Sequence, residues 1–160
     1  MNDADLVPSP SDSKVLALCS TICPGKPMLV PVKPEPGALQ RMCFQNVERK
    51  VQAEGGSTVY GWNILQTRLI YLEATFHAVW RSPKGQLICL SPRDRKLDHI
   101  LFLKDETRTH IDKGALPRRS SLSKNTPLVQ ELWSLFQRFA KIHNPPMNQY
   151  LIICPVEVPQ

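Results

Sequence analysis

The sequence predicts an α+β domain, in which one helix precedes a group of β-strands and a second helix follows them. Apolar side chains recur at helical spacing in residues 38–54 and again after Pro127. Between these segments, residues 70–81 alternate apolar and polar side chains, which is the pattern of a strand with one buried face. Because the strands follow one another through short turns, we expect them to form an antiparallel sheet.

The composition fits one folded domain. The chain has 160 residues, of which 42% are hydrophobic and 21% are charged, values close to those of globular proteins. Prolines gather before residue 37 and after residue 144. We therefore expect residues 1–27 to form a flexible N-terminal arm, with a helical turn at Val15–Leu18, and residues 28–160 to form a single α+β domain.

Turn residues and periodicity place the elements of this domain. The first helix ends at Gly55-Gly56, and the second begins at Thr126-Pro127, a favourable cap and first-turn pair. Gly61 interrupts a strand and indicates a bulge. The expected strands are an edge strand at residues 28–33, then 58–65, 70–81, 86–90 and 99–104, and a last short strand at 150–154, with a long loop over 105–126.

Charge and cysteine content exclude several classes of protein. The net charge is +6, but the basic residues are spread along the chain, and the short run at residues 93–96 is not interleaved with aromatics. We interpret it as solvated surface and expect no nucleic-acid partner. The five cysteines form no knot pattern, the first residues lack a signal peptide, and no apolar run could cross a bilayer. We expect a cytoplasmic protein with free thiols and no membrane partner, although secretion without a signal peptide would leave no such trace.

Cys43 and His77 are the residues best placed for chemistry. A helix N-terminus favours the thiolate that a cysteine nucleophile needs, and Cys43 lies near the start of the first helix. His77 lies in the middle of a strand, on the face that carries Glu73 and Thr75, where it could act as a base. Such residues are more often a buried thiol and a half-buried imidazole, so periodicity alone does not establish catalysis.

Several short motifs in the sequence also resemble those of a known family. The resemblance covers residues 28–104, about half of the chain, and its most specific part is EATFHAVW at residues 73–80. The region resembles an uncharacterised bacterial family whose members share the pattern CFxNV, GG, YGW, EAEFHAVW and PdGxLVDITP. The other matching motifs in this chain are CFQNV (43–47), GG (55–56), YGW (60–62), GQL (85–87) and LSP (90–92). That family is similar to a papain-like or transglutaminase-like core, in which Cys opens a helix, His lies on a strand, and Asp or Asn lies on the next strand.

The resemblance implies a cysteine-dependent hydrolase or acyl transferase acting on an amide or thioester, such as a peptidase, amidase, deamidase or acyltransferase with a peptide or protein substrate. Cys43 would be the nucleophile and His77 the general base. Asn46 or Gln40 would help to hold the site or donate to the oxyanion. No P-loop, dinucleotide fingerprint or His-Glu-x-x-His motif occurs, so we expect no cofactor.

Position 89 departs from the family pattern. Cys89 stands where the family has Asp, and a neutral thiol stabilises an imidazolium poorly. The triad would then be a dyad assisted by Ser91, Asp94 or Glu73. Loss of an orienting carboxylate costs about 10⁴ in turnover in a well-studied triad. A catalytically inactive relative that serves as a binding or interaction module is therefore the alternative.

A small zinc site is the third hypothesis. Cys43, His77 and Cys89 could converge on one ion, with Cys19 and Cys23 adding to the ligand set. The cysteines include no C-x₂-C pair with a matched partner, so the spacing favours zinc less than the other two hypotheses, and we expect no metal.

Overall fold

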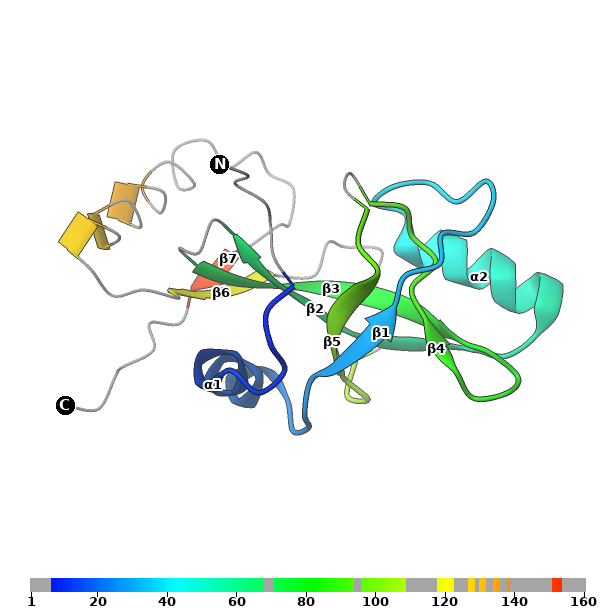
Figure 1. The fold of residues 1–160 in the computed structure, drawn as a ribbon, viewed down its shortest axis with the longest axis horizontal. Helices are drawn as coiled ribbons and strands as arrows, with labels where there is room; N and C mark the ends of the chain where they lie inside the picture. Colours follow the sequence, from blue (N-terminus) through cyan, green and yellow to red (C-terminus); the bar gives the residue numbers. More distant parts are fainter. Residues whose placement is uncertain are drawn as a thin grey trace.

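The computed structural model describes residues 7–67, 71–93, 96–108, 118–122, 127–128, 130–131, 134–135, 138 and 151–153. It confirms the α+β class, since helices and one mixed sheet share the chain (Figure 1). The elements in chain order are α1 (Ser13–Ile22), β1 (Met28–Pro31), α2 (Cys43–Glu54), β2 (Ser57–Thr67), β3 (Tyr71–Arg81), β4 (Leu87–Ile88), β5 (His99–Lys104), β6 (Arg118–Leu122) and β7 (Leu151–Ile153).

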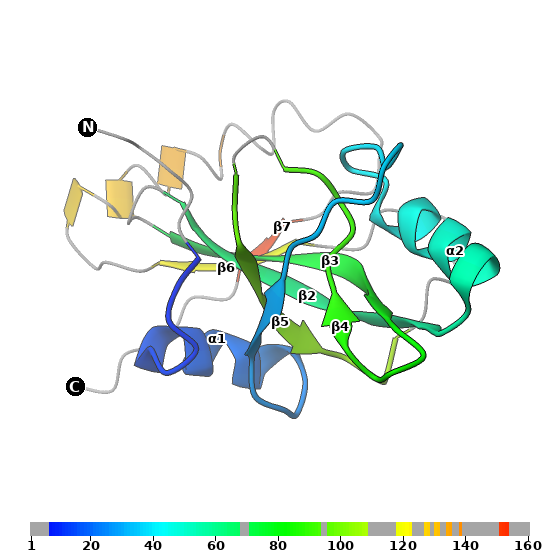
Figure 2. The ribbon, with the colours of Figure 1, turned by 45° about the vertical axis from the view of Figure 1, so that its right-hand side comes forward.

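The sheet curls until it nearly closes. Its strand order is β1-β5-β2-β3-β6-β7, and β4 pairs with β3 beyond the stretch that pairs with β6. Val32, which follows β1, forms a bridge with Cys89, which follows β4, so the ring β1-β5-β2-β3-β4 returns to its first strand (Figure 2). The backbone N–H of Cys89 donates to Pro31 O over 2.9 Å, and Lys33 N–H donates to Cys89 O over 2.9 Å.

Three apolar clusters result from this curvature. Each strand of the ring sends side chains inward to one of them, which consists of Val30, Val59, Val79, Cys89, Ile100 and Phe102. The outer face of the sheet is covered in two places, because α1 packs on one part of it and α2 on another (Figure 1). In β3, consecutive side chains therefore alternate between the interior of the ring and the helices.

The N-terminal segment differs from the expected flexible arm. Residues 13–22 form a full helix, and its side chains Val15, Leu18 and Cys19 are buried against Trp62 and other residues of β2, β3 and β5. Asp12 caps this helix by accepting from Lys14 N–H over 2.8 Å. The prolines on either side only delimit the helix. The short apolar run between them is spaced at i, i+3 and i+4, and this spacing gives the helix one buried face.

Helix α2 begins later than its apolar pattern indicates. Arg41 has a positive φ of 61°, which interrupts helical geometry before Cys43, so residues 38–42 are a turn rather than the first helical turn. The helix ends as expected at Gly55, which has a φ of 75° and donates its N–H to Val51 O. Cys43 is therefore the first residue of α2, not a residue one or two turns inside it.

Gly61 is not the site of a bulge, because β2 and β3 pair without interruption from Ser57↔Arg81 to Thr67↔Tyr71. A Cβ at Gly61 would lie 2.3 Å from Leu103 O and 2.5 Å from Cζ of Phe102. Glycine is required here by the close approach of β5.

The described C-terminal part agrees with the prediction in its helix and its last strand, but not at residues 118–122. The described residues between 127 and 138 are helical, although Leu128 and Leu135 are exposed rather than part of a core. Residues 118–122, expected as loop, form β6, which pairs antiparallel with β3 and parallel with β7. Among the described residues, no helix combines the length and the apolar character needed to cross a bilayer.

Candidate functional site

The site lies at an opening in the sheet beside β3. Strand β6 pairs with residues 71–74 of β3, and β4 pairs with residues 80–81. Within the described part of the chain, no strand pairs with residues 75–79 on that edge. His77 lies in the middle of this unpaired stretch, opposite Gly61 of β2.

Cys43 and His77 approach this edge from opposite faces of the sheet. His77 shares its face of β3 with Val79, which belongs to the interior of the ring. Helix α2 packs on the other face, where Val47 contacts Ala78 and Trp80. No hydrogen bond joins Cys43 to His77 among the described residues. Cys43 and His77 therefore lie on opposite faces of β3 beside its unpaired edge.

His77 contacts the residue that stands at the third position of the family pattern. Its Nε2 lies 3.3 Å from Cys89 Sγ, in a hydrogen bond whose direction depends on the imidazole tautomer. Both side chains are buried: His77 is 6% exposed and Cys89 is 0% exposed. In the tautomer in which Nε2 donates to Cys89 Sγ, Nδ1 is the ring nitrogen that can receive a proton from another group.

Burial controls the charge of both candidate catalytic groups. Desolvation raises the pKa of the Cys43 thiol above its usual range, although backbone hydrogen bonds at Ala78 and Phe44 and the charge of Arg93 oppose this. Desolvation, assisted by Arg93, lowers the pKa of His77 to about 3. The Cys43 thiol and the His77 imidazole are thus both neutral at rest, and the position of Cys43 at a helix N-terminus does not offset its burial.

Arg93 is the functional candidate that the sequence analysis missed. Its Nη2 lies 3.9 Å from Cys89 Sγ, and its charge acts on both Cys43 and His77. The run at residues 93–96 was interpreted as solvated surface, but Arg93 is half-buried. A signal was available, since Arg93 follows Cys89 by four residues on the segment that returns from the β3–β4 hairpin.

Asn46 and Ser91 support the site from the side of α2. Asn46 is 3% exposed, accepts from Leu39 N–H over 3.1 Å and donates through Nδ2 to Leu39 O over 2.7 Å. The same Nδ2 lies 3.4 Å from Ser91 Oγ, and Ser91 is 4% exposed. Asn46 therefore ties the turn before α2 and the segment after β4 to the helix, which is a positioning role.

The structure does not bring Gln40 or Glu73 into this group. Gln40 is exposed in the turn before α2. Glu73 pairs with Ser120 of β6, four residues along β3 from His77, and accepts from Thr75 Oγ1 over 3.2 Å. Because Gln40 is exposed and Glu73 lies beside β6 and Thr75, this geometry does not support the supporting role expected for either residue. Asp94, a further candidate, lies outside the described residues.

The described residues provide no group of three or more His, Cys, Asp and Glu side chains arranged to hold a metal ion. Cys19 and Cys23 lie in and after α1, in the apolar cluster beneath that helix, and Cys43 is not part of this cluster. Burial, and secondarily Cys23, raises the pKa of Cys19 to about 11, which is the behaviour of an inert buried thiol. The zinc hypothesis gains no support from this geometry.

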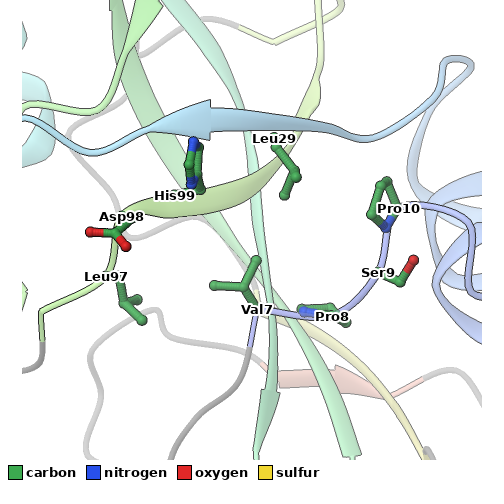
Figure 3. Close-up of a pocket in the computed structure, with 8 residues that line it drawn as sticks. All are labelled: Val7, Pro8, Ser9, Pro10, Leu29, Leu97, Asp98 and His99. Atoms are coloured by element: carbon green, nitrogen blue, oxygen red, sulfur yellow. The ribbon is translucent and has the colours of Figure 1, made fainter.

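A separate cavity of about 360 Å³ lies where residues 7–10 cross β1 and the start of β5 (Figure 3). Asp98 and His99 lie at one end of it, Ser9 and Pro10 at the other, and Val7 and Leu29 between them. It contains none of the residues of the Cys43–His77 site. His99 is exposed.

Comparison of the chain with protein-family models, with curated proteins and with solved structures finds no match.

Proposed function

We propose that the chain is a papain-like, cysteine-dependent hydrolase or acyl transferase that acts on an amide or thioester, with Cys43 as the nucleophile and His77 as the general base. The order of the parts supports this proposal. A cysteine opens a helix, a histidine lies on a following strand, and a third residue directly after the next strand contacts that histidine. This order and the motifs at residues 43–47 and 73–80 are what make the chain resemble the bacterial family described above.

The observation that carries the proposal is the 3.3 Å contact between His77 Nε2 and Cys89 Sγ. In a triad, the third group holds the ring so that its other nitrogen faces the nucleophile. Cys89 contacts the ring as that group would, and helix α2, which begins at Cys43, is bound to the same segment through Asn46 and Ser91. Sites of this kind often have long contacts without substrate, so the missing Cys43–His77 hydrogen bond is compatible with the proposal.

The proposed reaction starts from neutral groups. His77 accepts the thiol proton at Nδ1 as Cys43 Sγ attacks the carbonyl carbon, and returns it to the amine or thiol that leaves. Water or a second nucleophile then releases the acyl group from Cys43. The N–H groups at the start of α2, where Met42 provides no side-chain cap, are suited to stabilise the oxyanion.

A catalytically inactive fold that serves as a binding module is the second candidate. Two observations favour it: Cys89 replaces a carboxylate at the third position, and burial keeps the Cys43 thiol protonated. Inactivity and weak activity differ in one respect that can be measured. An intact but weakened site should regain activity when a carboxylate is placed at position 89, whereas a site that has lost its geometry should not.

Cys89→Asp tests the proposal directly. We expect acylation of Cys43 by p-nitrophenyl acetate or a thioester to accelerate by roughly 10² or more, because an orienting carboxylate is worth about 10⁴ in a comparable triad. Cys89→Asn is the matched neutral control and should accelerate much less. The readout is the mass of the acyl adduct on the Cys43 peptide, with Cys43→Ser as the blank.

Two results would contradict the proposal. One is a folded Cys89→Asp variant whose Cys43 is acylated no faster than in the wild type. If Cys89→Asp does not fold, His77→Ala replaces it as the test, and we expect Cys43 to be acylated more slowly in that variant than in the wild type. An unchanged rate is the second contradicting result and would favour the binding-module hypothesis.

A further inference from the structure

We propose that Arg93 is the substrate-binding residue of this site, and that it holds a carboxylate of the acyl donor beside Cys43. The inference rests on the proposed function and narrows its substrate class to acyl groups that carry a second, anionic end, of which a succinyl thioester is the simplest example.

The first argument is the incomplete bonding of the Arg93 guanidinium. Its Nε is buried and has no hydrogen-bond partner among the described residues. Its one hydrogen bond to a described residue runs to Cys89 Sγ over 3.9 Å, and a thiol is a weak acceptor. A buried N–H without a partner is costly, so such a group is usually satisfied by a ligand, water or an ion.

The second argument is charge. The ion pairs among the described residues involve Lys50, Lys104 and Arg108, and none involves Arg93. Within the described residues, Arg93 is also the only cation whose charge affects both Cys43 and His77. A half-buried guanidinium without an acidic partner attracts an anion, and its planar fork matches the oxygens of a carboxylate or a phosphate. Of these two groups, the carboxylate suits the acyl donor that the proposed function requires.

The third argument is rigidity. Ser91 lies two residues before Arg93 and is fixed against α2 by Asn46. Glu35 N–H donates to Leu90 O over 3.1 Å, so the backbone of the same segment is also bonded to the chain that follows β1. The base of the Arg93 side chain is therefore held in place, and a carboxylate bound to it would lie at a defined distance from the Cys43 thiol.

Succinate and its neutral analogue succinamide test this inference on the full chain. We expect succinate, and not succinamide, to slow the modification of Cys43 by the neutral reagent N-ethylmaleimide and to raise the thermal unfolding midpoint. In Arg93→Gln, succinate should bind about tenfold more weakly or worse, because a charge-assisted hydrogen-bonded pair is lost. Arg93→Lys keeps the charge without the fork and should be intermediate.

Arg49→Gln is the matched control, since Arg49 is exposed on α2 and its loss removes the same charge from the chain. It should leave the effect of succinate unchanged. Equal effects of succinate on wild type and Arg93→Gln, or no effect on the wild type, would overturn the inference. If Arg93→Gln does not fold, Arg93→Lys is compared with the wild type instead. Equal effects of succinate on these two proteins would likewise overturn the inference.

Succinate binding and catalysis can fail separately. If succinate binds through Arg93 but Cys43 is never acylated, the carboxylate site stands and the hydrolase proposal falls. If Cys43 is acylated equally fast by acetyl and succinyl thioesters, and Arg93→Gln changes neither rate, the hydrolase proposal stands and the role of Arg93 falls. If both proposals are right, the wild type has a lower KM for the succinyl thioester than for the acetyl thioester. This difference in KM should disappear in Arg93→Gln.

Discussion

Two buried polar groups lie on the same curled sheet, and they differ in how completely they are bonded. Asp105, just after β5, is 2% exposed and accepts three hydrogen bonds, from Trp62 Nε1 over 2.9 Å, from Thr107 N–H over 3.0 Å and from Thr107 Oγ1 over 2.6 Å. Among the described residues, His77 has one side-chain hydrogen bond, to the thiol of Cys89, and Arg93 Nε has no hydrogen-bond partner.

The difference separates a structural group from a candidate functional one. Desolvation raises the pKa of Asp105, but its hydrogen bonds to Thr107 and Trp62 outweigh that effect, so the pKa lies below its usual range and the carboxylate is stable. Nothing comparable stabilises a charged His77. Groups left under-bonded in a folded protein are where substrates and protons can act, which makes the His77 region the one to test.

Removing Asp105, the fully hydrogen-bonded group, should have the largest effect on the free energy of unfolding. Asp105→Ala is expected to lower the free energy of unfolding by about 4 kcal/mol, since it removes charge-assisted hydrogen bonds and leaves Trp62 Nε1 buried without a partner. Urea denaturation measures this. Asp105→Asn, which can still accept from Trp62, should cost clearly less. A loss below about 1 kcal/mol for Asp105→Ala would remove the contrast between the two regions, because it is within the range of one ordinary hydrogen bond.

Lowering the pH should have the second-largest effect on stability, through the buried imidazole of His77. The folded-state pKa of His77, about 3, lies below the unfolded value near 6.5, so the unfolded chain binds a proton first as pH falls. This contribution to stability is present above pH 6.5 and is lost on acidification towards pH 3, by about 3 kcal/mol between pH 7 and pH 4. Urea midpoints at pH 7, 5.5 and 4 measure it.

His77→Gln is the reference for that titration, because it cannot be protonated in this range, and carboxylates such as Asp105 contribute equally to both proteins. The difference between wild type and variant should therefore shrink as pH falls. Parallel pH profiles would show that His77 is charged or solvated in the folded protein and would contradict the buried neutral imidazole.

Asn46→Ala should have the smallest of these effects, about 2 kcal/mol, since it leaves Leu39 N–H and O without their side-chain partner. Because Asn46 joins α2 to the segment that carries Ser91, we also expect the succinate effect at Arg93 to weaken. Gln45→Ala, an exposed neighbour, should change stability by less than about 0.5 kcal/mol. Equal stability of the two variants would show that Asn46 does not hold the two segments together.

Much of the local structure was predictable because it depends on neighbours in the chain. The positive φ of Gly55 ends α2 where Gly55-Gly56 predicted, and β5 covers the expected residues His99–Lys104. The helix at Ser13–Ile22 was underestimated, since its stability depends on the apolar surface of β2 and β5, which the segment itself does not contain. The need for glycine at position 61 was likewise not visible in the neighbouring sequence, because it comes from the backbone of Leu103, about 40 positions later in the chain.

The sequence by itself determined the α+β class, the helix that carries Cys43, the strand that carries His77 and the anomaly at Cys89. Only the tertiary structure decided that Cys43 and His77 come from opposite faces of β3, that Cys89 contacts the imidazole and that Arg93 lies among them. The reason is that periodicity reports which face of an element is apolar, whereas contacts across a closing sheet depend on its curvature and on which edges remain unpaired. The burial that makes both candidate groups neutral is likewise a property of the packed site and not of any segment.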